Sequence, residues 1–415
     1  MRKYILTFAI FILSFTLLAQ EASHQTLVIN VEVPVRVFRG SLFIDSLTID
    51  DFEVYEDGKL QRLEAVYLIN KKNIERKEEK KKFDPDTART FYLFFEITDY
   101  SSRIDDALHY FMQNVLLPED DLVIVTPMKT YEMNPQALKL RSNDEIVKEL
   151  RGLLRRDAMI GSSEYRSSLS ELTKLTKAFS AVFQSTGEEG IRLDTDVSSE
   201  FAEAYERDPS LLLGMLIDNY RNVMERLNQL RYIDQSKLLD FAGSLKDKQG
   251  QKYVFLFYQR EYIPQVEPSL LMKIESEFQS SQHLTQNLAG LFSLFKRDIT
   301  FDVDWVKQAY ADSSASIHFM FFTQPAQHVP GIRFEEHSED IYSAFREMAV
   351  ATGGIAESSA NPFMLFKSAV ESSENYYILY YTPLNYRKDG QFKNIQVKIK
   401  NADYRVIHRA GYFAN

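Results

Sequence analysis

The sequence predicts an α/β protein with a largely parallel central sheet flanked by helices. Four short runs are almost continuously apolar, as expected of strands covered on both faces. These runs are Phe91–Thr98, Leu122–Pro127, Tyr253–Tyr258 and Ile317–Phe322. Segments with apolar residues at helical spacing alternate with them, and parallel strands need such crossovers. The chain has 415 residues, of which 45% are hydrophobic, so it can bury more than one core.

The N-terminus resembles a cleavable secretion signal over residues 1–19. Arg2 and Lys3 precede an apolar run from Tyr4 to Leu18, and the small residue Ala19 follows. The run is shorter than the roughly 20 residues that span a bilayer, although a retained anchor is the alternative. The chain has no cysteine, which excludes a lipid-modified N-terminal cysteine and any disulfide framework. We therefore expect a secreted or periplasmic protein with no stable membrane span after signal cleavage.

Residues 24–70 predict an N-terminal β module. Residues 26–39 alternate β-branched and polar side chains, as a half-buried strand does. Pro34 within this run predicts an edge position or a break. Asp57 and Gly58 stand between two apolar stretches, which is a strong hairpin signal.

A stretch of almost nothing but mixed charge predicts a solvated linker at residues 71–88. The α/β domain follows at residues 89–375. Strand patterns return at residues 376–415, which we expect to pack with the N-terminal module.

Two helical insertions are expected within the α/β domain, near residues 165–235 and 266–297. Asp208 and Pro209 form a helix-start signal, and apolar residues recur every three or four positions from Leu212 to Leu230. Packing of this helix on its parent domain is favoured over a coiled-coil partner site.

Oxygen-bearing side chains follow the first buried strand directly. Asp99 and Ser101 stand where a parallel strand presents its carboxyl end, which is where α/β sheets bind ligands. A carboxylate and a hydroxyl suit a hard divalent cation. The alternative is that both cap the helix that starts near Ile104.

The chain resembles von Willebrand factor type A domains, and more narrowly the bacterial secreted group of VWFA-related domains. The markers are VNVEVPVRV, LTIDDFEVYEDGK, EITDYSS, ATGG and the ending YYILYYTPLNYRKDGQFKNIQVKIK with HRAGYF. The resemblance implies a Rossmann-like type A domain with helical insertions. It also implies a small β module built from the N- and C-terminal segments.

The same resemblance implies where a metal-dependent adhesion site would lie. The family holds Mg²⁺ through an Asp-x-Ser-x-Ser loop, a threonine from a second loop and a later aspartate. Asp99 and Ser101 match the first loop, but Arg103 replaces its second serine. Ser163 takes the place of the threonine, and Gln259 stands where the later aspartate belongs. Any metal would therefore depend on Asp99, Ser101 and Ser163.

Arg103 argues against a bound cation. A guanidinium about 4 Å from a dication repels it by at least a few kcal/mol at an effective dielectric near 20. Facing inward, Arg103 would pair with Asp99 and replace the cation; facing outward, it would leave the site open to metal. We expect a degenerate, metal-free ligand-binding site without a cofactor, with Mg²⁺ binding as the alternative.

The remaining sequence features favour a binding protein over an enzyme. The formal net charge of −10 disfavours nucleic-acid binding. The seven histidines form no close metal-binding pair, and no nucleophile or phosphate-loop motif occurs, so no catalytic residue is assigned. We expect a non-enzymatic adhesion or scaffold protein that binds another protein of the envelope or extracellular space. The alternatives are a Mg²⁺-dependent adhesin and, less favoured, an unrecognised hydrolase.

Overall fold

A computed structural model describes seven stretches of the chain. They are residues 29–133, 135–184, 208–279, 281–294, 298–323, 332–400 and 403–415. The expected signal peptide at residues 1–19 lies outside them. In these stretches, no helix is long and apolar enough to cross a membrane.

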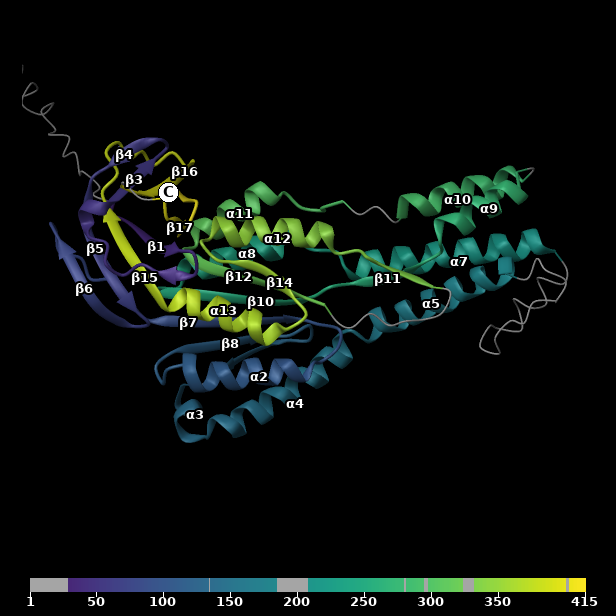
Figure 1. The fold of residues 1–415 in the computed structure, drawn as a ribbon, viewed down its shortest axis with the longest axis horizontal. Coiled ribbons are helices and arrows are strands. Elements are labelled where there is room, and N and C mark those ends of the chain that lie inside the picture. The colour runs from purple at the N-terminus through teal and green to yellow at the C-terminus, as the bar shows by residue number, and fades with distance from the viewer. Residues whose placement is uncertain are drawn as a thin grey trace, which may run out of the picture.

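A six-stranded sheet in the order β14–β12–β10–β7–β8–β9 forms the centre of the molecule. Its strands are β7 (Arg89–Glu96), β8 (Asp121–Val125), β9 (Thr130–Met133), β10 (Gln251–Gln259), β12 (Ala315–Phe322) and β14 (Ala356–Ser359). Aromatic and branched side chains fill both faces of β7, β10 and β12, because helices cover the sheet on both sides. Figure 1 shows these helices above and below the strands.

The expected fold class, a Rossmann-like type A fold with a largely parallel sheet, is wrong. The chain is a mixed α/β protein with several antiparallel sheets, and even the central sheet is only partly parallel. Only residues 126–129 join β8 to β9, which is far too short for a crossover, so β9 runs antiparallel to β8. The sequence signal for β9 is weak, because its side chains are only partly buried.

Three antiparallel sheets complete the described fold. One has the order β17–β1–β15–β5–β6 with β2 beside β1, another the order β18–β16–β3–β4, and the third pairs β11 with β13. Their bounds are β1 (Val31–Arg39), β2 (Leu42–Phe43), β3 (Phe52–Glu56), β4 (Lys59–Gln61), β5 (Leu63–Asn70), β6 (Asn73–Glu79), β11 (Tyr262–Gln265), β13 (Arg333–Glu336), β15 (Asn375–Tyr381), β16 (Phe392–Ile399), β17 (Arg405–His408) and β18 (Gly411–Phe413).

The structure differs from two local expectations. β1 is an inner strand rather than an edge, yet its pairing with β17 begins only at Val35, so the missing amide of Pro34 falls before that ladder. Where a linker was expected at residues 71–88, β6 pairs with β5 instead. Its charged side chains suit an exposed edge strand. The domain boundaries themselves stay a prediction.

Helices cover the two faces of the central sheet (Figure 1). On one face, α2 (Ser102–Tyr110), the π-helical turn η2 (Phe111–Val115), α4 (Asn143–Gly161) and α13 (Pro362–Glu374) pack on β7, β8 and β10. On the other face, α8 (Gln235–Asp247), α11 (Val303–Asp312) and α12 (Glu339–Ala351) pack on β7, β10 and β12. The short helices η1 (Ile49–Asp51) and α3 (Pro135–Leu140) lie in connections.

A helical arm extends away from the sheets with a core of its own. It consists of α5 (Ser163–Gln184), α7 (Pro209–Leu230), α9 (Pro268–Glu277) and α10 (Gln282–Leu294), with the ribbon β11–β13 at its root. Figure 1 shows these helices side by side beyond the end of the central sheet. The apolar stripe of α7 therefore packs within the chain, on α5 and α10.

A buried ion pair lies at the start of β7. The side chains of Arg89 and Asp120 are 3% and 0% exposed, and their nearest nitrogen and oxygen are 2.5 Å apart. Asp120 also accepts a hydrogen bond from the Leu117 amide at 2.7 Å and pairs with Lys72 at 2.9 Å. This carboxylate thus joins the β5–β6 hairpin to the central sheet.

We predict that Asp120→Ala lowers the free energy of unfolding by about 3–5 kcal/mol, because it leaves a buried guanidinium without its counter-ion. Urea unfolding measures the loss. Asp121→Ala is the matched control, since Asp121 forms a half-exposed pair with Lys248 at 2.9 Å, whose loss costs less than about 1 kcal/mol. Equal losses in the two variants would contradict the prediction.

Candidate functional site

The structure brings the predicted site residues to the carboxyl ends of β7 and β10. Asp99 follows β7, and Gln259 is the last residue of β10. Ser101 and Arg103 lie at the start of α2, and Ser163 opens α5. Because β7 and β10 are parallel neighbours, their carboxyl ends meet at one edge of the sheet.

Gln259 holds the loop after β7 in place. Its side chain is buried, and its amide oxygen accepts hydrogen bonds from the backbone nitrogens of Thr98 at 3.1 Å and Asp99 at 3.3 Å. A buried backbone amide without a partner is costly, so this one carboxamide satisfies two donors. Gln259 is therefore a positioning residue for the loop.

The cation beside Asp99 is Arg166 rather than Arg103. Nη1 of Arg166 lies 3.8 Å from the Asp99 carboxylate, and Nη2 donates to the Met159 carbonyl at 2.6 Å. Arg103 turns the other way and donates to the Ala360 carbonyl at 2.6 Å. Sequence reasoning missed Arg166, since no local motif says which face of α5 turns toward β7.

The two serines have different positions from those that the resemblance implies. The Ser101 hydroxyl accepts a hydrogen bond from the Arg103 amide at 3.3 Å, so it caps α2. Ser163 is exposed on the first turn of α5. Its neighbour Ser162 is the residue that reaches the loop, because its hydroxyl lies 2.9 Å from the Thr98 carbonyl.

These side chains do not fit a divalent cation. Asp99 is the one carboxylate among the five predicted residues, and a guanidinium already lies beside it. The amide oxygen of Gln259 is taken up by two backbone donors, and the Ser101 hydroxyl by a helix cap. Across the described stretches, no three His, Asp or Glu side chains come together as metal ligands.

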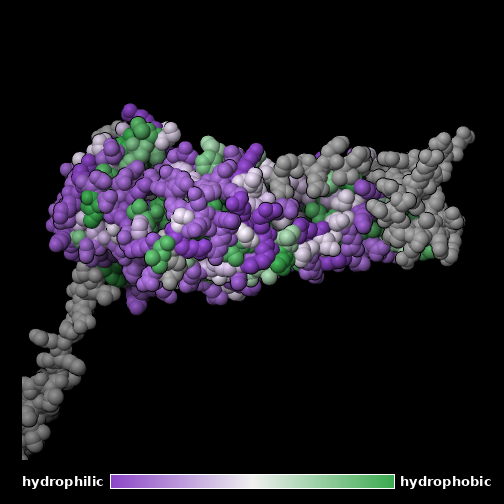
Figure 2. All heavy atoms as spheres, turned by 90° about the horizontal axis from the view of Figure 1, so that it is seen from below, coloured by the Kyte–Doolittle hydropathy of each residue, from purple (hydrophilic) through white to green (hydrophobic). Residues whose placement is uncertain are grey.

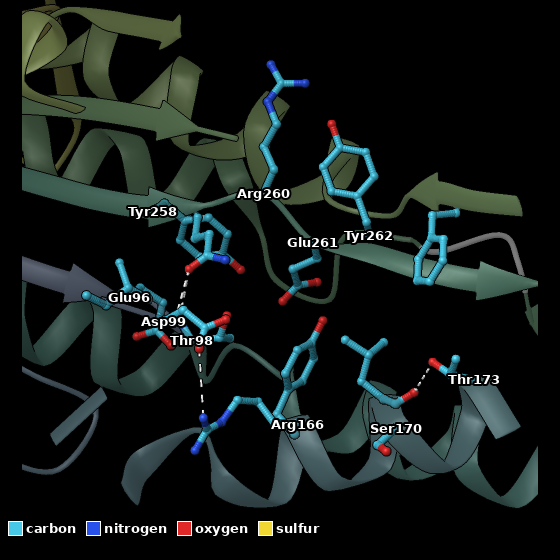
Figure 3. A pocket seen from close by; sticks show the side chains of 15 residues that line it. Glu96, Thr98, Asp99, Arg166, Ser170, Thr173, Tyr258, Arg260, Glu261 and Tyr262 are labelled. Atoms are coloured by element: carbon cyan, nitrogen blue, oxygen red, sulfur yellow. Dashed lines mark hydrogen bonds and ion pairs between the residues drawn. The ribbon is translucent and has the colours of Figure 1, made fainter. Parts of the chain in front are cut away.

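A pocket of about 360 Å³ opens beside this loop, between the central sheet and the helical arm. Figure 3 shows its walls, which come from the end of β7, from α5 and from the turn between β10 and β11. The lining residues are Glu96, Ile97, Thr98, Asp99, Tyr165, Arg166, Leu169, Ser170, Thr173, Tyr258, Gln259, Arg260, Glu261, Tyr262 and Phe334. Asp99 and Gln259 are thus the predicted residues that reach the pocket.

Glu96 contributes a carboxylate to this pocket. The side chain is open to solvent through the pocket, but protein surrounds it, and this desolvation raises its pKa above the usual 4.5. No described residue donates a hydrogen bond or forms an ion pair to that carboxylate. The sequence shows only a glutamate near the end of an apolar strand, which signals nothing by itself.

Other charged groups of the pocket have partners. Nη1 of Arg260 lies 2.6 Å from the Glu336 carboxylate, and its guanidinium stacks over Phe321 at 4.6 Å. Glu261 forms an ion pair with the buried Arg231. These pairs fix the turn between β10 and β11, and Figure 3 shows Arg260 pointing away from Glu96 and Asp99.

Comparisons with models of protein families, with curated proteins and with solved structures find no match to this chain. The resemblance to VWFA-related domains therefore stays a prediction that rests on sequence markers. The function is inferred below from the geometry of the described residues.

We predict that Mg²⁺ leaves the melting temperature unchanged within about 1 °C, because the oxygen atoms that could bind it at this edge already have hydrogen-bond or ion-pair partners. A specific ligand at about 100 times its Kd would add about 2.7 kcal/mol, a readily measured shift. Differential scanning fluorimetry with Mg²⁺ or a chelator checks this. A Mg²⁺-dependent rise that Asp99→Asn abolishes would show that the metal-free interpretation is wrong.

We predict that Glu96→Gln raises the melting temperature slightly near pH 7. The pKa of Glu96 is higher in the folded than in the unfolded chain, so its ionisation weakens folding as pH rises above the usual 4.5. Near pH 4 the carboxyl is largely protonated in both states, and the gain should shrink toward zero. A gain that is the same at both pH values would contradict this origin.

Proposed function

We propose that this chain is a secreted or periplasmic, non-enzymatic protein that binds another protein through the carboxyl edge of its central sheet. The binding surface is formed by the loop after β7, the adjoining end of α4 and the β8–β9 turn. The predicted absence of catalysis and of a cofactor is part of this proposal. Kinship with secreted VWFA-related proteins, predicted from motifs, is compatible with it but does not carry it.

One observation carries the proposal: three large apolar side chains are exposed on two adjoining segments at this edge. Met128, Met159 and Ile160 are 50%, 57% and 50% exposed. We call them the apolar patch. The backbone of Gly161, which follows Ile160, lies against Pro127 and Met128, so the two segments are in contact. Such a patch on a surface that is otherwise mostly hydrophilic (Figure 2) favours a protein interface.

The composition of the patch suits recognition of a protein surface. Methionine is flexible and polarisable, so it adapts to an irregular partner face. The charged pair of Asp99 and Arg166 borders the patch, because Arg166 binds the Met159 carbonyl. An apolar centre with a polar border is the usual anatomy of a protein interface.

The edge is also held rigidly, which lowers the entropic cost of binding. Gln259 fixes the loop after β7, and Ser162 fixes the same loop from α4. Buried Asp157 accepts hydrogen bonds from Thr126 at 2.9 Å and from Tyr131 at 2.6 Å, which ties α4 to the β8–β9 turn.

The test uses a photo-crosslinking amino acid in place of Met159. We predict that it captures a specific envelope or secreted protein from the producing cells, whereas the same residue at Val350 does not. Val350 is the matched control because it is 63% exposed but lies on α12, on the other side of the sheet. The captured protein is then purified and its Kd measured.

We predict that the double substitution Met159→Glu and Ile160→Glu weakens binding of the captured protein by about tenfold or more, because it places charges in an apolar contact. Val350→Glu should leave the Kd unchanged. Circular dichroism verifies that both variants fold. An unchanged Kd in the double variant would refute the proposed surface.

A further inference from the structure

The pocket between the central sheet and the helical arm has a composition that the apolar patch does not share. Four aromatic rings line it: Tyr165, Tyr258, Tyr262 and Phe334. Glu96 also lines it, and Tyr258 is its direct neighbour on β10, so both side chains leave the sheet on the same face. The pocket thus combines one carboxylate with several aromatic faces.

The other charged groups that line the pocket already have partners, so none of them neutralises the Glu96 carboxylate. The charged groups lining the pocket beside it are Asp99, Arg166, Arg260 and Glu261. Arg166 is engaged by Asp99 and by a backbone carbonyl of α4, and Glu261 by Arg231. Arg260 is engaged by Glu336 of β13 and by Ser358 of β14.

The direction of Arg260 follows from the order of the strands. Phe321, under its guanidinium, belongs to β12, and Ser358 belongs to β14. Both strands lie on the side of β10 opposite to β7 and Glu96. Arg260 therefore leans away from Glu96, and neither arginine of the pocket neutralises this carboxylate.

The pocket suits a single side chain. Its volume of about 360 Å³ is near the lower end of the range of about 300–1,000 Å³ for small-molecule sites. A carboxylate binds an ammonium or guanidinium through charge-assisted hydrogen bonds, and aromatic faces attract the same cations. The net charge of −10 over the whole chain draws basic partners toward it.

We propose that this pocket receives a cationic side chain, lysine or arginine, from the partner protein, with Glu96 as its counter-ion. This inference rests on the proposed function and names the chemistry of the partner at that site. Binding would place the cation among the rings of the pocket, while the apolar patch contacts the surrounding surface of the partner.

The first experiment uses side-chain mimics and needs no identified partner. N-acetyl-lysine N-methylamide and N-acetyl-arginine N-methylamide are titrated into the full mature chain, and binding is followed by NMR shifts or calorimetry. The neutral norleucine derivative has nearly the same shape as lysine and serves as the control ligand. We expect at least one cationic mimic to bind, and the norleucine mimic to bind at least about tenfold more weakly.

The protein variants locate the site. Glu96→Gln keeps the shape of the side chain and should lower the affinity for the cationic mimic by about tenfold or more. Glu132→Gln is the matched control, because Glu132 is an exposed strand glutamate on β9, two strands away from β7. It should leave the affinity unchanged. Equal affinity for norleucine and lysine, or an unchanged affinity in Glu96→Gln, would overturn the proposal.

The captured partner distinguishes this inference from the proposed function. If Glu96→Gln and the double patch variant both weaken binding of the captured partner, both proposals hold. If only the patch variant weakens it, the surface holds and the cation pocket is refuted. If neither does, the proposed function fails, and mimic binding alone would then assign the pocket to a free cationic ligand, which also overturns the inference.

Discussion

The carboxamide of Gln259 is the contact on which the geometry of this edge depends. Beyond the end of a parallel strand, the backbone amide groups have no acceptor on the neighbouring strand. A loop that leads into a helix leaves these hydrogen-bond donors without partners. The amide oxygen of Gln259 takes two such donors, at Thr98 and Asp99, and so fixes β7 to β10 beyond the last rung of their ladder. A carboxylate at this position would be drawn to a cation, whereas a neutral amide needs none. The loop therefore holds its shape through hydrogen bonds within the chain.

The root of the helical arm uses the same edge as its support. Ser162 contacts the loop after β7, and Arg166 one turn later pairs with Asp99. On the opposite side, Arg231 at the end of α7 binds Glu261 and the His337 carbonyl. Polar contacts thus join the arm to the sheet, while each part keeps a separate apolar core. The pocket lies at this junction because side chains from both parts meet there without filling it.

Patterns within one strand or helix were predictable, and contacts between distant segments were not. The runs that became β7, β8, β10 and β12 are apolar enough to identify from local composition, and Asp99 was placed correctly after the first of them. The pairing of Val31 with Tyr381 leaves no local trace, because its partners are 350 positions apart, and the expectation that the two terminal segments pack together came in part from the resemblance. The charged strand β6 was missed for a related reason, since its pairing with β5 is set by the neighbouring strand rather than by its own side chains.

The site was predictable to a similar extent. Gln259 was singled out through the resemblance, as the residue that stands where the family's later aspartate belongs, and the structure places it at the end of β10. Arg166 and Ser162 were not predicted as site residues, because the rotation of α5 and the residue at which it begins decide which side chains face β7. Glu96 was not predicted, because the pocket that it lines forms only where the arm, the sheet and the β10–β11 turn come together.

The pairing of β1 with β15 has a consequence for the order of folding. Tyr381 must be available before Val31 can find its partner, so this sheet cannot form while only the first part of the chain is exposed. The helical arm, by contrast, gathers its core from residues much closer in sequence, between Leu172 and Leu291. Long-range closure of this kind is slow, because loop entropy is lost before the contacts form. We therefore expect the helical arm to fold before the sheet that contains both β1 and β15.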